Sequence, residues 1–206
     1  MNLQRAEAAR VPVAQDVCNG PQALEKCSPL WNPRHFREEA APFRVDLAAQ
    51  DDLAAAHQLA EELVGMRLAP LSALADSHAL TEASAWIYRC RDTRDVSGVL
   101  LNLPLNAEGE IALILGRFNT GNPDPEHLCA PGDPVSAMYI WFTGGRGLRA
   151  RSAVMRTALA WRDGIYGGLR AYSRAATSGG ARGLATLRFA PLASRDLGLM
   201  FCDKRR

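Results

Sequence analysis

Paired cysteines and long apolar runs are both missing from this sequence of 206 residues. Its five cysteines are widely scattered and form no CxxC pair, so reduced thiols are expected instead of a disulfide framework. The spacings of Cys18, Cys27 and His35 match no common zinc pattern, and no metal site is predicted. The longest apolar runs span only a handful of residues, so no membrane partner is expected.

The first ten residues also lack the apolar stretch of a secretory signal, which favours a cytoplasmic location. Hydrophobic residues make up 48% of the chain, enough for the core of one domain. Residues 1–41 contain four prolines among small and charged residues and predict a partly disordered extension. Residues 42–206 predict the folded domain, on which the apolar stretch 30–36 is expected to dock.

The net charge of +2 conceals an uneven distribution along the chain. From Pro134 onward there are 13 lysines and arginines against three aspartates, a net charge of +10. Residues 1–133 carry the compensating −8. Such an asymmetry indicates a phosphate-bearing ligand, a nucleic acid, or attraction between the two halves of the chain.

Hydrophobic periodicity predicts the element order β-α-α-β-β-β-β-α-β-α-β, without an internal repeat. The expected strands are 43–47, 85–90, 96–105, 110–118, 137–142, 169–176 and 197–202. The expected helices are 53–64, 68–80 and one beginning at residue 148. Residues 177–191 predict either a glycine hairpin or a short helix capped by Ser178. The proline-rich stretch 119–134 predicts a long loop, and both a binding loop and a simple insertion stay open.

The stretch Ala137–Asp163 carries the clearest functional signal: a short strand, the glycine-rich turn 143–147, and an arginine-rich helix. A strand that delivers such a turn to a helix N-terminus makes an anion site, because unpaired amides and the helix dipole point the same way. Arginines in the first half of the helix oppose that dipole, and a bound polyphosphate would offset the cost. Solvated arginines beside a tight turn are the alternative.

This succession of elements resembles the GNAT superfamily of acyl-CoA-dependent N-acyltransferases over roughly residues 43–203. In that family a turn of the form Q/R-x-x-G-x-G/A follows the fourth strand and holds the pyrophosphate of coenzyme A on backbone amides. The nearest match here is 144–150, with Gly147 at the central glycine and Arg149 at the second small residue. Residues 171–191 resemble the family's fifth strand and following short helix, with Leu184 where a tyrosine acid often stands.

The resemblance implies an α/β fold with a mixed, mostly antiparallel central sheet flanked by helices. It implies acetyl-CoA or another acyl-CoA as co-substrate, and as acceptor an unidentified amine of a small molecule or a protein. The cofactor-binding residues it implies are Phe142, Thr143, Gly144, Gly145, Arg146, Gly147, Leu148, Arg149 and Ala150. A homodimer is compatible with the family.

For catalysis, acyl transfer to an amine needs a base, donors to the developing oxyanion and a proton for the departing thiolate. Glu110, at the start of an expected strand, is the best-placed carboxylate for the base. Tyr139 and Tyr172, on strands expected to be neighbours, are candidates for the acid or the oxyanion donor. The alternatives are a surface glutamate and two core tyrosines.

Two other functions stay open. The departures from the family's turn and the absent tyrosine favour a non-catalytic domain that binds coenzyme A or a partner protein. The basic C-terminal half, with its interleaved aromatic residues, is compatible with a protein that binds nucleic acid or another polyanion. Nucleic acid is the less favoured partner, because the sequence contains no recognised nucleic-acid-binding motif.

Overall fold

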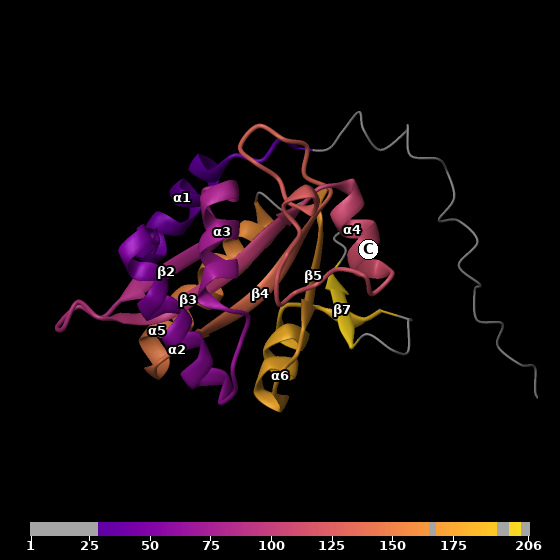
Figure 1. Cartoon of the computed structure of the whole chain (residues 1–206). Helices are drawn as coiled ribbons and strands as arrows, with labels where there is room; N and C mark the ends of the chain where they lie inside the picture. Colours follow the sequence, from indigo (N-terminus) through magenta and orange to yellow (C-terminus); the bar gives the residue numbers. More distant parts are fainter. Residues whose placement is uncertain (1–28, 165–167, 193–197, 203–206) are drawn as a thin grey trace, which may run out of the picture.

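The computed structural model describes residues 29–164, 168–192 and 198–202, which form one seven-stranded sheet flanked by helices (Figure 1). The strands are β1 (Val45–Leu47), β2 (Ala85–Arg89), β3 (Val96–Leu105), β4 (Ala137–Gly145), β5 (Arg170–Arg174), β6 (Ala190–Pro191) and β7 (Leu199–Cys202). The helices are α1 (Pro33–Ala40), α2 (Leu53–Val64), α3 (Leu71–Thr81), α4 (Ala107–Ile114), α5 (Gly147–Asp163) and α6 (Ser178–Thr186). Short 3-10 helices are η2 (Ala41–Phe43), η3 (Gln50–Asp52) and η4 (Pro125–His127).

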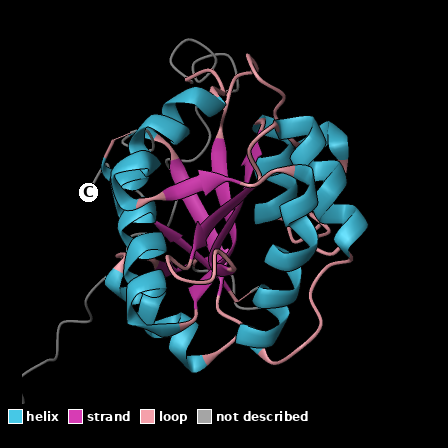
Figure 2. Ribbon diagram, turned by 90° about the vertical axis from the view of Figure 1, so that its left-hand side faces the viewer, coloured by secondary structure: helices cyan, strands magenta, loops and turns pink. Residues whose placement is uncertain are grey.

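The strand order is β1-β2-β3-β4-β5-β7-β6, and only the pair β4–β5 is parallel. The sheet is therefore mixed and mostly antiparallel, as expected. Helices cover both of its faces (Figure 2). Residues of α1, α5 and α6 pack in one core cluster on what we call the α5 face. Residues of α2, α3 and α4 pack against the opposite, or α2, face.

Most of the elements expected from periodicity are present. Helix α2 ends at Gly65, whose φ of 75° is in the left-handed region that favours glycine. Strands β2 and β3 form the expected hairpin. Residues 178–186 form a helix, not a hairpin, and its cap is Thr177 instead of Ser178, because the Thr177 hydroxyl accepts a hydrogen bond from the amide of Gly180.

The strand predicted for residues 110–118 is wrong, because Ala107–Ile114 is helix α4. The side chain of Asn106 accepts a hydrogen bond from the Gly109 amide, and two glutamates follow in the first turn, as helix N-termini prefer. Strands β3 and β4 pair directly from Gly98 to Leu105, so the sheet leaves no room for a strand between them. Strand β4 is consequently the fourth strand in the chain.

The turn predicted for residues 143–147 is also shorter than expected. Strand β4 pairs with β3 as far as Gly145, and α5 begins at Gly147, so Arg146 alone connects them. An added Cβ on Gly145 would lie 2.9 Å from the backbone nitrogen of Arg151. Glycine at this position therefore lets the first turn of α5 lie directly against the end of β4.

The apolar stretch 30–36 contributes to the core under α5. Trp31 and Phe36 are each 2% exposed, and the Trp161 indole donates a hydrogen bond to the Phe36 carbonyl. The Trp31 indole likewise donates to the carbonyl of Thr81, at the end of α3. The division of the chain at residue 41 stays a prediction, since residues 1–28, including Cys18 and Cys27, lie outside the described residues.

Candidate functional site

Strands β4 and β5 form a fork in the sheet. They pair over four residues, from Ala137 opposite Arg170 to Ile140 opposite Ser173, and then diverge. At the point of divergence the Ser173 hydroxyl donates a hydrogen bond of 2.9 Å to the Ile140 carbonyl. Beyond it β4 continues to Gly145 with β3 as its partner. Within the described residues, positions 141–145 therefore have no strand partner on the side that faces β5.

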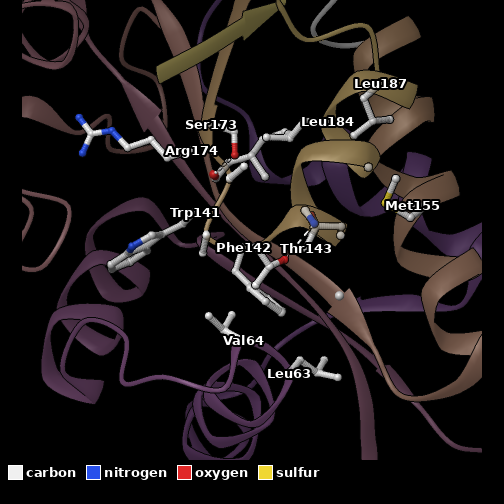
Figure 3. A pocket seen from close by; sticks show the side chains of 18 of the residues that line it. Leu63, Val64, Trp141, Phe142, Thr143, Met155, Ser173, Arg174, Leu184 and Leu187 are labelled. Atoms are coloured by element: carbon white, nitrogen blue, oxygen red, sulfur yellow. Dashed lines mark hydrogen bonds between the residues drawn. The ribbon is translucent and has the colours of Figure 1, made fainter. Parts of the chain in front are cut away.

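A cavity of about 480 Å³ lies in this fork (Figure 3), and we call it the fork cavity. Residues 141–145 of β4 form one wall, and residues 173–187, from β5 into α6, form another. Leu63 and Val64 of α2 and Met155 of α5 add apolar side chains. Most of the lining is apolar or glycine, as in typical ligand pockets.

The lining of the fork cavity includes residues of helices on both faces of the sheet, and β4 carries a bulge at this point. Leu101 of β3 pairs with Phe142 and Asn102 pairs with Ile140, so Trp141 is left without a partner on β3. Trp141 and Phe142 pack on the α2 face, whereas Ile140 belongs to the core of the α5 face. The bulge thus turns two consecutive aromatic side chains toward the same side.

The polar groups that line the fork cavity are few. They are the side chains of Thr143, Arg151, Ser173, Arg174 and Thr177 and the indole N–H of Trp141. Among the described lining residues there is no carboxylate, histidine, tyrosine or cysteine. The Thr143 hydroxyl and the Nε of Arg174 are buried and have no hydrogen-bond partner in the described part of the chain. Both are polar atoms of lining residues whose hydrogen-bonding capacity the described residues do not use.

The predicted cofactor-binding residues are divided between two cavities. Phe142–Gly145 line the fork cavity. Arg146–Ala150 instead line a second cavity of about 440 Å³, between the start of α5 and the β2–β3 turn, which we call the hairpin cavity. The Arg146 guanidinium forms an ion pair with Glu62 of α2, and Leu148 is 78% exposed. The structure therefore does not gather these residues around one space.

The N-terminus of α5 separates the two cavities. Its first residue, Gly147, has a φ of 74°. The residue before it, Arg146, is at the N-cap position, and its side chain makes no capping hydrogen bond. Arg151 donates from Nε to the Gly147 carbonyl over 3.3 Å and also lines the fork cavity. Among the arginines of the β4–α5 junction and the first half of α5, Arg151 is thus the one that lines the fork cavity.

Two of the predicted catalytic residues lie together, at the closed end of the β4–β5 pair. Glu110 is in α4 and is 3% exposed, so it is neither a strand residue nor a surface glutamate. It accepts hydrogen bonds from Tyr172 at 2.8 Å and from Ser136, and Arg170 donates to both of its oxygens at 2.9 and 3.1 Å. We call these four residues the Glu110 cluster. None of them lines the fork cavity.

Both predicted tyrosines are buried. Burial, reinforced by the Glu110 carboxylate, raises the pKa of Tyr172, so that this hydroxyl stays protonated and donates to Glu110. Burial also raises the pKa of Tyr139, while the charge of Arg174 acts in the opposite direction. Tyr139 is 4% exposed and packs near Phe118, with 6.1 Å between the ring centroids. It lies outside the lining of the fork cavity.

Sequence reasoning did not select Arg174. It ends β5, and alternation along the strand places it on the same face as Arg170 and Tyr172. The spacing Arg170, Tyr172, Arg174 in an otherwise small and apolar strand is the signal that could have identified it. Its importance arises from the divergence of β4, which the sequence does not reveal.

No protein-family model and no curated protein matches the chain. Among solved structures, the chain is similar to one described as histone acetyltransferase HPA2 and related acetyltransferase from Corynebacterium glutamicum. The two chains are 18% identical, the match covers 76% of this chain and 93% of the other, and the TM-score is 0.46. The fold class follows from the mixed sheet itself, in which β4–β5 is the one parallel pair among the described strands and opens into a fork.

The described residues contain no helix that is both long and apolar enough to cross a membrane. They also contain no group of three or more histidine, cysteine, aspartate or glutamate side chains that could hold a metal ion.

Proposed function

We propose that this protein is a GNAT-like N-acyltransferase that transfers an acyl group from an acyl-CoA to an amine. The observation that carries the proposal is the fork between β4 and β5, with a cavity of about 480 Å³ in it. The resemblance of the element order to the GNAT superfamily, and the glycines at the β4–α5 junction, point to the same co-substrate.

The fork cavity suits the pantetheine arm of an acyl-CoA. That arm is a narrow chain with two amide groups, and residues 141–145 of β4 present backbone along one wall with no strand partner toward β5. Gly144, Gly179 and Gly183 in the lining allow a ligand to approach the backbone closely. The phosphates would lie at the start of α5, near Arg151, where amides and helix dipole favour an anion.

The reaction would proceed by attack of a neutral amine on the thioester carbonyl carbon. The carbon–nitrogen bond forms, the carbon–sulfur bond breaks, the nitrogen loses a proton to solvent, and the departing thiolate takes up a proton. Because the described lining supplies no carboxylate or tyrosine, the rate would come from positioning the two reactants. We therefore expect the rate to rise with pH until the amine itself is fully deprotonated.

One observation favours the non-catalytic alternative on the same fold. Glu110, Tyr139 and Tyr172 lie outside the lining of the fork cavity, so the predicted acid and base groups are not beside a bound thioester. A domain that binds an acyl-CoA without turnover would have this arrangement. Measurements of binding and of turnover on the same protein separate the two functions.

Calorimetric titration with acetyl-CoA and with free coenzyme A tests the proposal, and Gly183 offers the sharpest variant. Gly183 lines the fork cavity, and a Cβ added there would have nothing within 4 Å. In Gly183→Leu the new side chain fits α6 but occupies the cavity, so acetyl-CoA affinity should fall about tenfold or more, roughly 1.4 kcal/mol.

Ala185→Leu is the matched control. Ala185 lies on the same helix, is exposed and does not line the cavity, so its replacement should leave acetyl-CoA affinity within about twofold of the wild type. Absence of wild-type binding at millimolar acetyl-CoA would refute the acyltransferase and the coenzyme-binding domain together. Equal acetyl-CoA affinity of wild type and Gly183→Leu would show that acetyl-CoA binds outside the fork cavity.

A further inference from the structure

Arg174 is a lining residue of the fork cavity on the α2 face of the sheet. In Figure 3 the side chains of Arg174 and Trp141 run to the same side, away from Met155 and Leu187. The alternation of β5 agrees, because Ala171 packs on the α5 face and Tyr172 on the α2 face, so that Arg174 shares the face of Tyr172.

Arg170 and Arg174 lie on the same face of β5 but have opposite surroundings. The Arg170 guanidinium is held by both carboxylate oxygens of Glu110. Arg174 has no carboxylate beside it in the described lining of the cavity, and its buried Nε has no hydrogen-bond partner there. The positive charge of Arg174 lowers the pKa of Tyr139, against the larger rise that burial causes.

An arginine with a buried, unpaired donor is costly unless a ligand supplies the acceptor. A guanidinium presents parallel N–H groups that match the two oxygens of a carboxylate, and partial exclusion of water strengthens the contact. We propose that Arg174 binds a carboxylate of the acceptor, so that the acceptors are amines that carry a carboxylate, of which α-amino acids are the simplest class. This inference rests on the acyltransferase function proposed above.

The position of Arg174 assigns the carboxylate to the acceptor instead of to the phosphates of coenzyme A. Arg151 and the N-terminus of α5 lie on the α5 face, where the phosphates have both amides and a positive charge. Arg174 lies across the fork on the α2 face. An acceptor amine that enters from the α2 face would reach the thioester without crossing the pantetheine arm.

Matched pairs of amines that differ only in the carboxylate test the inference. Suitable pairs are L-phenylalanine with phenethylamine, L-leucine with isoamylamine and L-tryptophan with tryptamine. Release of coenzyme A from acetyl-CoA is measured for each amine with the wild type, Arg174→Gln and Arg174→Lys. Arg182→Gln is the control, because it removes an exposed arginine from α6 that does not line the cavity.

The expected result is a KM at least about tenfold lower for the carboxylate member of a pair in the wild type and in Arg182→Gln. In Arg174→Gln that ratio should fall toward one, and Arg174→Lys should restore part of it, since lysine keeps the charge but loses the planar fork. Acetyl-CoA affinity, measured by calorimetry on the same preparations, reports on the proposed function separately.

Three outcomes overturn the inference while the proposed function stands. They are equal KM values within every pair, a preference that survives Arg174→Gln, and absence of acylation of the whole panel by protein that binds acetyl-CoA. A further arm replaces acetyl-CoA with succinyl-CoA. If Arg174→Gln weakens the use of succinyl-CoA about tenfold but leaves the amine preference intact, the carboxylate belongs to the acyl group and the assignment to the acceptor is wrong.

Discussion

The buried polar groups at the two ends of the β4–β5 pair differ in whether they have hydrogen-bond partners. At the closed end, Glu110 receives Arg170, Tyr172 and Ser136, so that a buried carboxylate has its partners within the protein. At the open end, Arg174 and Thr143 keep buried polar atoms without partners in the described chain. A completed network stabilises the fold, whereas a buried polar atom without a partner is unfavourable and calls for an explanation. This contrast supports our proposal of a ligand in the fork and not beside Glu110.

Removing Glu110 should have the largest effect. In Glu110→Ala the Arg170 guanidinium and the Tyr172 hydroxyl lose their acceptor, and the free energy of unfolding should fall by about 3 kcal/mol. Urea unfolding measures it, and Glu108→Ala, which replaces an exposed glutamate on the same helix turn, should cost less than about 0.5 kcal/mol. Arg174→Gln should cost less than about 1 kcal/mol, since no described carboxylate loses a partner. Equal costs for Glu110→Ala and Arg174→Gln would remove the contrast between the two ends.

Two glycines that line the fork cavity have contrasting surroundings, since Gly145 is closely packed and Gly183 is not. A Cβ on Gly145 would lie 2.9–3.0 Å from backbone atoms of Ala150 and Arg151, so Gly145→Ala should destabilise the protein by about 2 kcal/mol. Gly183→Ala adds a methyl group where nothing lies within 4 Å and improves helix propensity, so it should be neutral or stabilising by up to about 1 kcal/mol. Thermal unfolding of both variants tests the pair. A stable Gly145→Ala would mean that α5 does not lie against β4 as described.

The division of the arginines between two cavities predicts different effects on coenzyme binding. Arg151 lines the fork cavity and Arg149 lines the hairpin cavity. Arg151→Ala should weaken binding of free coenzyme A about tenfold, and Arg149→Ala less than about threefold, because the phosphates need a positive charge next to the fork. Calorimetry at one fixed ionic strength makes the comparison. The reverse order would place the phosphates in the hairpin cavity.

Alkaline pH should lower the free energy of unfolding through Tyr172 at the closed end, by less than the substitutions above. The pKa of Tyr172 is raised in the folded protein, so above the ordinary tyrosine pKa of about 10 the unfolded chain loses a proton that the folded chain keeps. The Tyr172 contribution is complete below pH 10 and is lost as pH rises above it. Urea unfolding between about pH 9 and 11 should show stability falling, with a shallower slope in Tyr172→Phe. Tyr139, whose pKa is also raised, supplies part of the remaining slope. An unchanged slope in Tyr172→Phe would remove Tyr172 from this dependence.

Local patterns predicted the elements whose environment is uniform along the chain. Helix α2 has an apolar face at helical spacing and a terminal glycine, and the β2–β3 hairpin has two apolar strands around a polar turn. The strand prediction for residues 110–118 was wrong because an apolar run is compatible with either a buried strand or a buried helix. The cap at Asn106 was the local evidence that favoured the helix.

The candidate site was harder to predict than the fold, because it depends on contacts distant in sequence. Glu110 and Tyr172, separate candidates for the base and for the acid or oxyanion donor, are joined to Arg170 in a buried cluster outside the lining of the fork cavity. Residues 142–150, predicted to bind the cofactor, lie at the junction of β4 and α5, where the packing of α5 against β4 divides them between two cavities. Whether these residues bind a cofactor or catalyse acyl transfer stays a prediction.

The sequence by itself determined the order of most helices and strands, the charge of the C-terminal half, and the glycines that allow α5 to begin beside β4. These follow from periodicity, composition and backbone freedom, which act over a few residues. Only the tertiary structure decided that β4 and β5 part after Ile140, that Glu110 has its partners within the protein and that the Nε of Arg174 has none among the described residues. Those outcomes depend on which side chains from distant segments share a desolvated space, and that is settled when the sheet and its helices pack together.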